Sequence, residues 1–256
     1  MDGDKKRVAI CFSGHIRDYM KCHANITSNL IQPMYEAGYT VDIFFSTWDT
    51  IGHRSQGWGG DIGNIIKIAN PTAVLIEKFD RDHFVQKYQS DQWKSRTHLS
   101  GPQTSGDSVS MWYKIYTCWA LMKQHQSLYG KKYQAVFRTR PDIIYDSKFD
   151  PNWLKNLNDT TVMMAHWHGK YREVNMEMMD HFAFGRPLAM DYYMNLVKYV
   201  REYLDNPSVI HTAEGMLAHH LNKGEYDVGR IPILYSVQRA NGIEVIATDK
   251  DEVLSK

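Results

Sequence analysis

The first 80 residues alternate between short apolar runs and segments with a helical pattern. Apolar runs lie at 7–13, 40–49 and 73–79, and helix-like segments at 18–37 and 61–69 separate them. Short apolar runs that do not alternate with polar residues are typical of parallel strands buried on both faces. Strands that alternate with helices in this way favour a doubly wound sheet. We therefore predict an α/β fold with a mostly parallel central sheet flanked by helices.

Pro33 predicts a kink or a late break in the helix expected over 18–37. Further elements follow along the chain. The polar segment 91–108 predicts either a loop that covers a bound ligand or a plain surface connection. Apolar residues then recur every three or four positions over 109–127, which predicts a helix capped by Ser108 or Ser110. The remaining predicted elements are strands at 135–137, 161–167 and 226–237, a short strand and turn in 180–190, and helices at 187–204 and 212–222.

The composition is that of an ordinary globular enzyme. The 256 residues are 43% hydrophobic and 23% charged, and no linker divides them. The net charge of +1 gives no field that would draw the protein to nucleic acid or to an anionic membrane. No apolar run approaches the roughly 20 residues of a membrane span, and the charged N-terminus does not resemble a signal peptide. We expect a single domain over 1–256 with a cytoplasmic location, in which the sequons at Asn25 and Asn158 are chance matches.

The segment 135–146 carries an unusual group of charges. Its apolar beginning is followed at once by Arg138, Arg140 and Asp142. Charged groups at the end of a buried strand are unfavourable unless a ligand or a partner compensates them. Arginine binds phosphate oxygens through paired N–H donors, and carboxylate oxygens suit Mg²⁺ or Mn²⁺. The pattern indicates a site for a phosphorylated ligand with a divalent cation, and the simpler interpretation is a surface ion pair of Arg140 with Asp142 or Asp146.

Polar residues also lie at the ends of the first two predicted strands. Ser13, Gly14 and Arg17 belong to the end of the first, and Ser46 and Asp49 to the end of the second. Ligands of doubly wound sheets bind outside the carboxyl ends of the strands, so these groups are expected to face one crevice. We expect the crevice to hold a nucleotide.

Two further positions are candidates for ligand binding. Lys114 lies one turn into the helix predicted from 109, within reach of an anion at the helix N-terminus, although such a lysine is more often solvated. His166 and His168 fall on one face of a predicted strand without a third ligand beside them. His166 is a candidate for a cation site, and histidine is more often not a ligand.

Three common motifs are missing from the sequence. The absence of GxxxxGK[ST] argues against a P-loop kinase or sulfotransferase, and the absence of GxSxG argues against an α/β-hydrolase. No GxGxxG follows the first strand, where SGHIR stands instead, and this argues against a dinucleotide-binding dehydrogenase. A nucleotide site in this chain must therefore be built differently.

An ordered set of short motifs resembles a known family. The set comprises SGxxR from Ser13, FSTWD ending at Asp49, SMWYKIY from Ser110, RTRPD from Arg138 and DHFAFG from Asp180. In this order the motifs resemble the small glycosyltransferases of the GT-A type that occur in bacterial surface-polysaccharide loci and in large DNA viruses of algae. The resemblance extends over roughly residues 7–225.

The resemblance implies a GT-A-like, Rossmann-like fold that transfers a sugar from a nucleotide-diphosphate donor to a glycan or another hydroxyl acceptor. It implies a nucleotide-binding half over about 7–145 and an acceptor-side half over about 146–240. Enzymes of this type carry Asp-x-Asp after a central strand, where it chelates Mn²⁺ or Mg²⁺ on the diphosphate. The matching place here is Arg140-Pro141-Asp142, which keeps only the final aspartate. Either Asp142 binds the cation together with a histidine such as His166, or arginine neutralises the diphosphate instead.

Glycosyl transfer requires a stabilised diphosphate leaving group and a carboxylate that takes the proton of the acceptor hydroxyl. Arg138, Arg140 and Asp142 are candidates for the first role, and Asp180 or Glu214 for the second. Glu214 also lies in the first turn of a predicted helix, where a carboxylate is favourable without any catalytic role.

Two other functions are compatible with the sequence. A nucleotidyltransferase would use a similar sheet and cation, but it would consume a nucleoside triphosphate instead of a nucleotide sugar. A non-catalytic carbohydrate-binding protein would keep the fold, and the missing first aspartate favours it. Turnover of a nucleotide sugar would exclude the binding protein, because the site and not the fold decides function.

Overall fold

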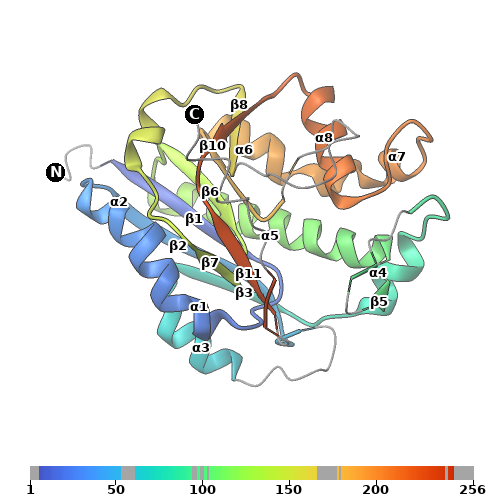
Figure 1. The fold of residues 1–256 in the computed structure, drawn as a ribbon, viewed down its shortest axis with the longest axis horizontal. Helices are drawn as coiled ribbons and strands as arrows, with labels where there is room; N and C mark the ends of the chain where they lie inside the picture. Colours follow the sequence, from blue (N-terminus) through green and yellow to red (C-terminus); the bar gives the residue numbers. More distant parts are fainter. Residues whose placement is uncertain are drawn as a thin grey trace, which may run out of the picture.

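The centre of the fold is a seven-stranded sheet (Figure 1). The computed structural model describes residues 6–52, 61–93, 97–98, 101–102, 104–165, 178, 180–239 and 242–244. The strands of the sheet are β1 (Arg7–Ser13), β2 (Thr40–Trp48), β3 (Ala73–Glu77), β6 (Ala135–Thr139), β8 (Thr161–Ala165), β9 (Phe182–Gly185) and β10 (Asp227–Ile231). Their order is β10-β8-β9-β6-β1-β2-β3, and only β9 is antiparallel to its neighbours. The predicted mostly parallel α/β sheet is confirmed.

Helices cover both faces of this sheet, as Figure 1 shows. One face carries α1 (Tyr19–Ile26), the π-helical turn η1 (Thr27–Ile31), α2 (Gln32–Glu36) and α3 (Ile62–Ala69). The other carries α4 (Arg81–Lys87), α5 (Ser105–Tyr129), α6 (Pro187–Met194), the 3-10 turn η3 (Leu196–Tyr199), α7 (Val200–Leu204) and α8 (Ala213–Lys223). Alternate strand residues enter the two cores: Ile10 faces the first and Cys11 the second. The strands are apolar on both faces because both faces are covered.

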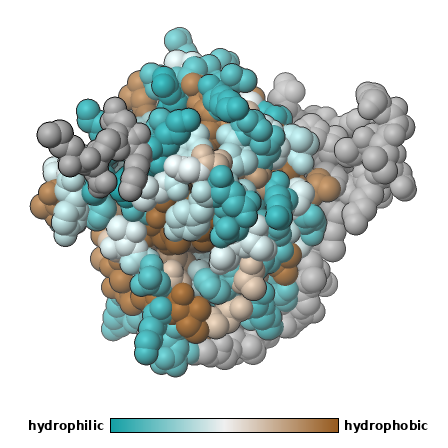
Figure 2. All heavy atoms as spheres, turned by 90° about the vertical axis from the view of Figure 1, so that its left-hand side faces the viewer, coloured by the Kyte–Doolittle hydropathy of each residue, from teal (hydrophilic) through white to brown (hydrophobic). Residues whose placement is uncertain are grey.

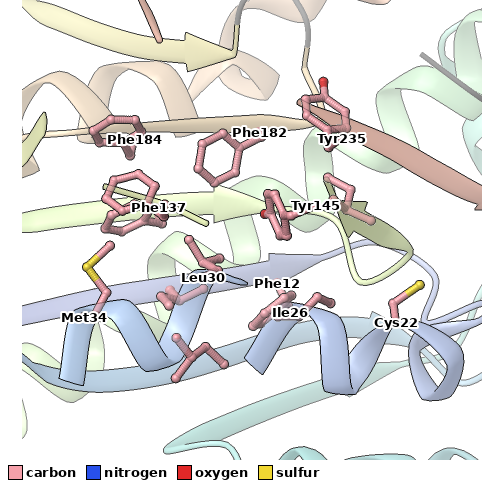
Figure 3. Close-up of a cluster of buried hydrophobic side chains, with 14 of the residues drawn as sticks. Phe12, Cys22, Ile26, Leu30, Met34, Phe137, Tyr145, Phe182, Phe184 and Tyr235 are labelled. Carbon is pink, nitrogen blue, oxygen red and sulfur yellow. The ribbon is translucent and has the colours of Figure 1, made fainter. Parts of the chain in front are cut away.

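Smaller elements complete the first face. A three-stranded sheet in the order β12-β11-β7 contains β7 (Ile143–Tyr145), β11 (Tyr235–Arg239) and β12 (Gly242–Glu244). The 3-10 turn η2 (Pro151–Asn156) follows β7 on this face. Apart from these elements, a two-stranded ladder joins β4 (Thr97–His98) to β5 (Gly101–Pro102). Figure 3 shows the core beneath β7 and β11, where Phe137, Phe182 and Phe184 meet side chains of α1 to α2.

The first helical segment is interrupted where Pro33 had predicted a kink. Proline has no N–H, so it cannot donate to the carbonyl of residue 29 four positions earlier. The chain forms the π turn η1 just before Pro33, and the Asn29 carbonyl accepts a hydrogen bond from the Phe149 N–H at 2.8 Å instead. The helix ends as expected at Gly38, whose φ of +83° favours glycine. The interruption therefore ties the N-terminal helices to the chain after β7.

Asparagine side chains strengthen this connection. Asn25 Oδ1 accepts the Tyr145 N–H at 2.7 Å, and Asn25 Nδ2 donates to the Tyr145 carbonyl at 2.9 Å. Asn29 Nδ2 donates to the same carbonyl at 2.9 Å. Both backbone polar groups of Tyr145 are thus satisfied by α1 and η1, which fixes β7 against the first face of the sheet.

The start of α5 differs from the prediction. The helix begins at Ser105, and its cap is Thr104, whose side chain accepts the Asp107 N–H while Asp107 accepts the Thr104 N–H. Reciprocal bonding of this kind is a capping box. The predictions of a start near 109 and of Ser108 or Ser110 as the cap are therefore wrong. The predicted loop 91–108 accordingly ends before Ser105, and part of it lies outside the described residues.

Two other helical regions also depart from the sequence pattern. A short helix that the pattern did not indicate, α4, begins after Asp80, whose side chain accepts the His83 N–H. The single helix predicted over 187–204 is divided into α6, η3 and α7. Asn195, between the first two, turns its side chain onto the Asp191 carbonyl and so competes with the helical backbone.

The surface is mixed in character. Figure 2 shows hydrophilic residues interspersed with smaller hydrophobic areas on the face at the left of Figure 1. Exposed large hydrophobic side chains are spread over several elements: Met20, Tyr35, Ile68, Val74, Ile76, Leu128, Tyr129 and Leu188. Among the helices of the described chain, none combines the length and apolar character that crossing a membrane requires.

Candidate functional site

The order of the strands creates a switch point between β1 and β6. From β1 the chain passes outward to β2 and β3, and it then returns to β6 on the other side of β1. Ligands of open α/β sheets bind in the crevice outside the carboxyl ends of strands at such a point. The segments that leave β1 and β6 there contain Arg17 and Arg140, two of the residues expected at the site.

Arg17 and Arg140 meet at Asp142. Arg140 donates from Nε and Nη2 to the two oxygens of Asp142, each at 2.8 Å. Arg17 Nη1 donates to Asp142 Oδ2 at 2.9 Å. The side chain of Asp142 is 1% exposed, whereas those of Arg140 and Arg17 are 11% and 17% exposed. Two arginines that reach the surface thus share one buried carboxylate.

The chain that carries Arg17 has an unusual backbone. Gly14 has a φ of +106°, and its N–H donates to the Ser46 carbonyl at 3.1 Å. Arg17 itself has a φ of +47°, which is uncommon for a residue with a β-carbon. Non-glycine residues in this region are enriched at functional sites, where the surrounding structure holds them. The geometry therefore supports a binding role for the segment after β1.

Arg138 lies deeper than the other two arginines. In the sheet it stands between Cys11 of β1 and Ala183 of β9, two small residues that leave room beside its side chain. It is fully buried, and within the described part of the chain none of its three nitrogens has a hydrogen-bond partner. Ser13 Oγ is likewise buried and without a partner among the described residues. A buried guanidinium without hydrogen bonds is strongly unfavourable unless a ligand or solvent satisfies it.

Asp180 lies beside these arginines. It comes just before β9, and the Arg140 N–H donates to the carbonyl of the next residue, His181, at 3.2 Å. Burial would raise the pKa of Asp180, but the charges of His181, Arg138 and Arg140 outweigh it and hold the pKa below its ordinary value. His181 Nε2 is 3.4 Å from Asp180 Oδ1. Asp180 is therefore an ionised, buried carboxylate at neutral pH.

Two tyrosines at the site were not indicated by the sequence. Tyr193 of α6 and Tyr235 of β11 are buried, and neither hydroxyl has a hydrogen-bond partner within the described residues. Burial raises the pKa of both, and the charge of Asp180 acts in the same direction. Their apolar neighbours in sequence predict only core packing, so no local signal distinguishes them.

Lys114, Ser46 and Asp49, three further candidates for ligand binding, have partners within the protein. Lys114 is fully buried more than two turns into α5, where its ammonium donates to Glu77 at 2.6 Å and lies 4.1 Å from the centre of the Trp48 ring. Ser46 Oγ lies 2.6 Å from Thr117 Oγ1, within hydrogen-bonding distance. Asp49 accepts the Phe79 N–H at 2.9 Å and so closes the chain after β3. These three residues are explained by packing and hydrogen bonding within the protein.

The remaining candidates lie elsewhere. Glu214 occupies the first turn of α8, where Thr212 caps the helix, and this position stabilises a carboxylate through the helix dipole. The helix packs on α5, α6 and η3. His166 and His168 lie outside the described residues.

The donor set around Asp142 does not suit a divalent cation. Both carboxylate oxygens accept N–H groups from arginine, and two guanidinium charges repel a metal ion placed beside them. Among the residues that the structure describes, no group of three His, Cys, Asp or Glu side chains could hold a metal.

Comparison with known proteins provides no assignment. No family model matches the chain, and no curated protein matches it in sequence.

Proposed function

We propose that this protein is a glycosyltransferase that takes a sugar from a nucleotide-diphosphate donor and transfers it to a hydroxyl acceptor. The observation that carries the proposal is the sharing of Asp142 by Arg17 and Arg140 at the switch point between β1 and β6. A fold-level resemblance alone would leave the function open. Here the charged groups stand where an α/β sheet binds its ligands.

The arginines suit a diphosphate leaving group. Transfer forms a bond between the acceptor oxygen and the anomeric carbon while the bond from that carbon to the diphosphate breaks. The diphosphate leaves with the electron pair and can take up the proton of the acceptor hydroxyl, and its negative charge increases in the transition state. Arg17 and Arg140 are partly exposed and preoriented by Asp142, so their N–H groups can stabilise that charge without a metal.

The two proposed bases differ in how well they fit. Asp180 lies beside the arginines, whereas Glu214 has the helix-terminal position described above. A general base works best when its pKa is near the working pH, and the pKa of Asp180 is below its ordinary value. Asp180 is therefore better suited to accepting hydrogen bonds than to removing a proton.

A ligand screen tests the proposal. We would measure the melting temperature with nucleoside diphosphates, nucleoside triphosphates and nucleotide sugars, and then assay release of nucleoside diphosphate from the sugar donor that binds. A ligand at 100 times its dissociation constant adds about 2.7 kcal/mol to the free energy of unfolding. Arg17→Met and Arg140→Met should each weaken nucleoside diphosphate binding by roughly 10-fold or more, because each removes a charged hydrogen-bond donor.

Arg186→Met is the matched control for these variants. Its guanidinium is 50% exposed and lies 3.7 Å from Asp159, so its loss should leave nucleotide binding unchanged. If no nucleotide shifts the melting temperature, the proposal fails. Stabilisation and turnover with nucleoside triphosphate alone would indicate the nucleotidyltransferase. Binding of a nucleotide sugar without any turnover would indicate a non-catalytic protein.

A further inference from the structure

Three buried polar groups without partners gather around Asp180. They are the guanidinium of Arg138 and the hydroxyls of Tyr193 and Tyr235, and none of them has a hydrogen-bond partner among the described residues. All three interact electrostatically with Asp180. Yet the described structure shows no hydrogen bond from any of them to its carboxylate. Arg138, Tyr193 and Tyr235 therefore have hydrogen-bonding capacity beside this carboxylate that the described protein does not use.

The groups belong to separate elements on both faces of the sheet, with Tyr193 in the core of the second face and Tyr235 in the core of the first. Arg138 belongs to β6, Tyr193 to α6, which packs on β6 and β9, and Tyr235 to β11. The ring of Tyr235 lies 6.0 Å from that of His181, the neighbour of Asp180. Figure 3 shows Tyr235 at one end of a row of aromatic rings that includes Phe182 and Phe184. Its position places a polar hydroxyl at the margin of an otherwise apolar core.

A nearby tyrosine has the partner that these groups lack. Tyr145 is also buried and lies close to Tyr235, with ring centres 6.5 Å apart. Its hydroxyl nevertheless lies 2.8 Å from Thr139 Oγ1, within hydrogen-bonding distance. Native proteins satisfy nearly all buried polar groups, so several orphaned groups around one carboxylate require an explanation.

The chemistry of the groups limits what fits between them. A bound anion would face the carboxylate of Asp180, and a bound cation would face the guanidinium of Arg138. A hydroxyl donates to the carboxylate and accepts from the guanidinium, and phenols can do either. The set therefore matches a neutral ligand with several hydroxyl groups.

We infer that Arg138, Asp180, Tyr193 and Tyr235 form a subsite for the hydroxyl groups of a neutral sugar. This inference rests on the proposed function and deepens it. Arg17 and Arg140 bind the diphosphate, and the inner subsite selects the sugar attached to it. Arg138 thus donates hydrogen bonds to sugar hydroxyls, whereas Arg17 and Arg140 neutralise the phosphates.

The test compares nucleotide sugars with the nucleoside diphosphate that they share. We would measure both dissociation constants by calorimetry in the wild type, Tyr193→Phe and Tyr235→Phe, each of which removes one oxygen and keeps the ring. Each variant should weaken binding of a neutral hexose donor by roughly 3- to 10-fold and leave nucleoside diphosphate binding unchanged. Asp180→Asn should weaken the sugar donor by 10-fold or more. Tyr145→Phe is the matched control and should not alter the ratio of the two constants.

A ratio unchanged in all three site variants would overturn the inference. Failure of the proposed function gives a different result, because no nucleotide would then bind even to the wild type. In that case free hexoses at high concentration are the probe, with tyrosine and tryptophan fluorescence as the readout. A response to hexoses that is lost in Tyr193→Phe and Tyr235→Phe supports the subsite. No response to any hexose, with ordered water alone between these groups in a crystal structure, overturns it.

Discussion

Lys114 and Arg138 are two fully buried cations on the same face of the sheet, and they differ in whether the protein provides them with hydrogen-bond partners. Lys114 donates to Glu77, which also accepts from Tyr113, and it lies over the Trp48 ring. Arg138 has no hydrogen-bond partner in the described chain. Side chains of the protein therefore satisfy the hydrogen-bonding groups of Lys114 but leave those of Arg138 unsatisfied.

The comparison separates structural charges from functional ones. A buried charge with close partners contributes to the fold and needs no ligand, whereas a buried charge without them is unfavourable until something binds. By this criterion Lys114 belongs to the framework of α5 and β3, and Arg138 is the candidate for a binding role. Each cluster should respond differently when one member is removed.

The largest effect on stability is expected from breaking the ion pair of Lys114 with Glu77. Glu77→Ala leaves the ammonium of Lys114 buried without a carboxylate, and it should lower the free energy of unfolding by about 3 kcal/mol. The measurement is urea denaturation at neutral pH. Glu202→Ala is the control, because Glu202 is 55% exposed in its pair with Lys223, and its loss should change stability by less than about 1 kcal/mol. Equal effects of the two substitutions would contradict the assignment of Lys114 to the framework.

A second completed group, His220, should make stability depend on pH. Its Nε2–H donates to the Tyr192 carbonyl at 2.9 Å, so Nδ1 accepts from the Tyr203 hydroxyl at 2.8 Å. Burial is the main cause that lowers the pKa of His220 to about 4. Because the folded pKa lies below the unfolded value, the stabilisation is complete above pH 6.5 and is lost as the pH falls toward 4.

The expected loss at His220 is about 2 kcal/mol between pH 6.5 and 4.5. Denaturation curves across this range should show the loss in the wild type and a correspondingly smaller slope in His220→Phe. His219→Gln, on the same helix, controls for the substitution of a histidine. An identical slope in His220→Phe would mean that His220 is not held neutral by its surroundings.

A smaller effect on stability is expected from substituting Arg138, which lacks hydrogen-bond partners in the described chain. Arg138→Met keeps the length of the side chain and removes a charge whose unfavourable burial is offset by its attraction to Asp180, so the free energy of unfolding should change by less than about 1 kcal/mol. Denaturation in the absence of ligand provides the measurement. A loss as large as that of Glu77→Ala would show that Arg138 supports the fold in the way that Lys114 does.

The smallest effect concerns metal. Because Arg17 and Arg140 occupy both oxygens of Asp142, stabilisation by a nucleoside diphosphate should be the same with chelator as with Mn²⁺. Thermal denaturation under the two conditions measures this. A larger shift with Mn²⁺ that disappears in Asp142→Ala would assign the cation to Asp142 and restore the metal-dependent alternative.

Much of the fold could be predicted because its signals are local. The runs at β1 and β2 are apolar and largely buried on both faces, which is why the sequence indicates buried parallel strands there. β3 lies at the edge of the sheet, where Val74 and Ile76 are exposed. The start of α5 could not be placed from its apolar pattern, because its first turn consists of small polar residues that are buried by contact with α4. The signal there was the pair Thr104 and Asp107 at capping-box spacing, three residues apart.

Only some residues of the candidate site could be predicted from the sequence in the same way. Arg17, Arg140 and Asp142 follow strands, so the rule for strand ends brought them together. Tyr193 and Tyr235 reach the site from α6 and β11, and nothing in their sequence surroundings distinguishes them from core tyrosines such as Tyr145. Lys114 shows the converse, because its partner Glu77 is distant in sequence and becomes a neighbour only in the folded sheet.

The hydrogen bonds between α1 and β7 also decide how the sequon at Asn25 must be interpreted. The amide nitrogen to which a glycan would be attached is the one that donates to the Tyr145 carbonyl, while the same side chain accepts the Tyr145 N–H. A glycan there would place a bulky polar group between the helix and the strand. Asparagine-linked modification at Asn25 and this native packing of β7 are therefore mutually exclusive, and the asparagine is explained by the strand it holds.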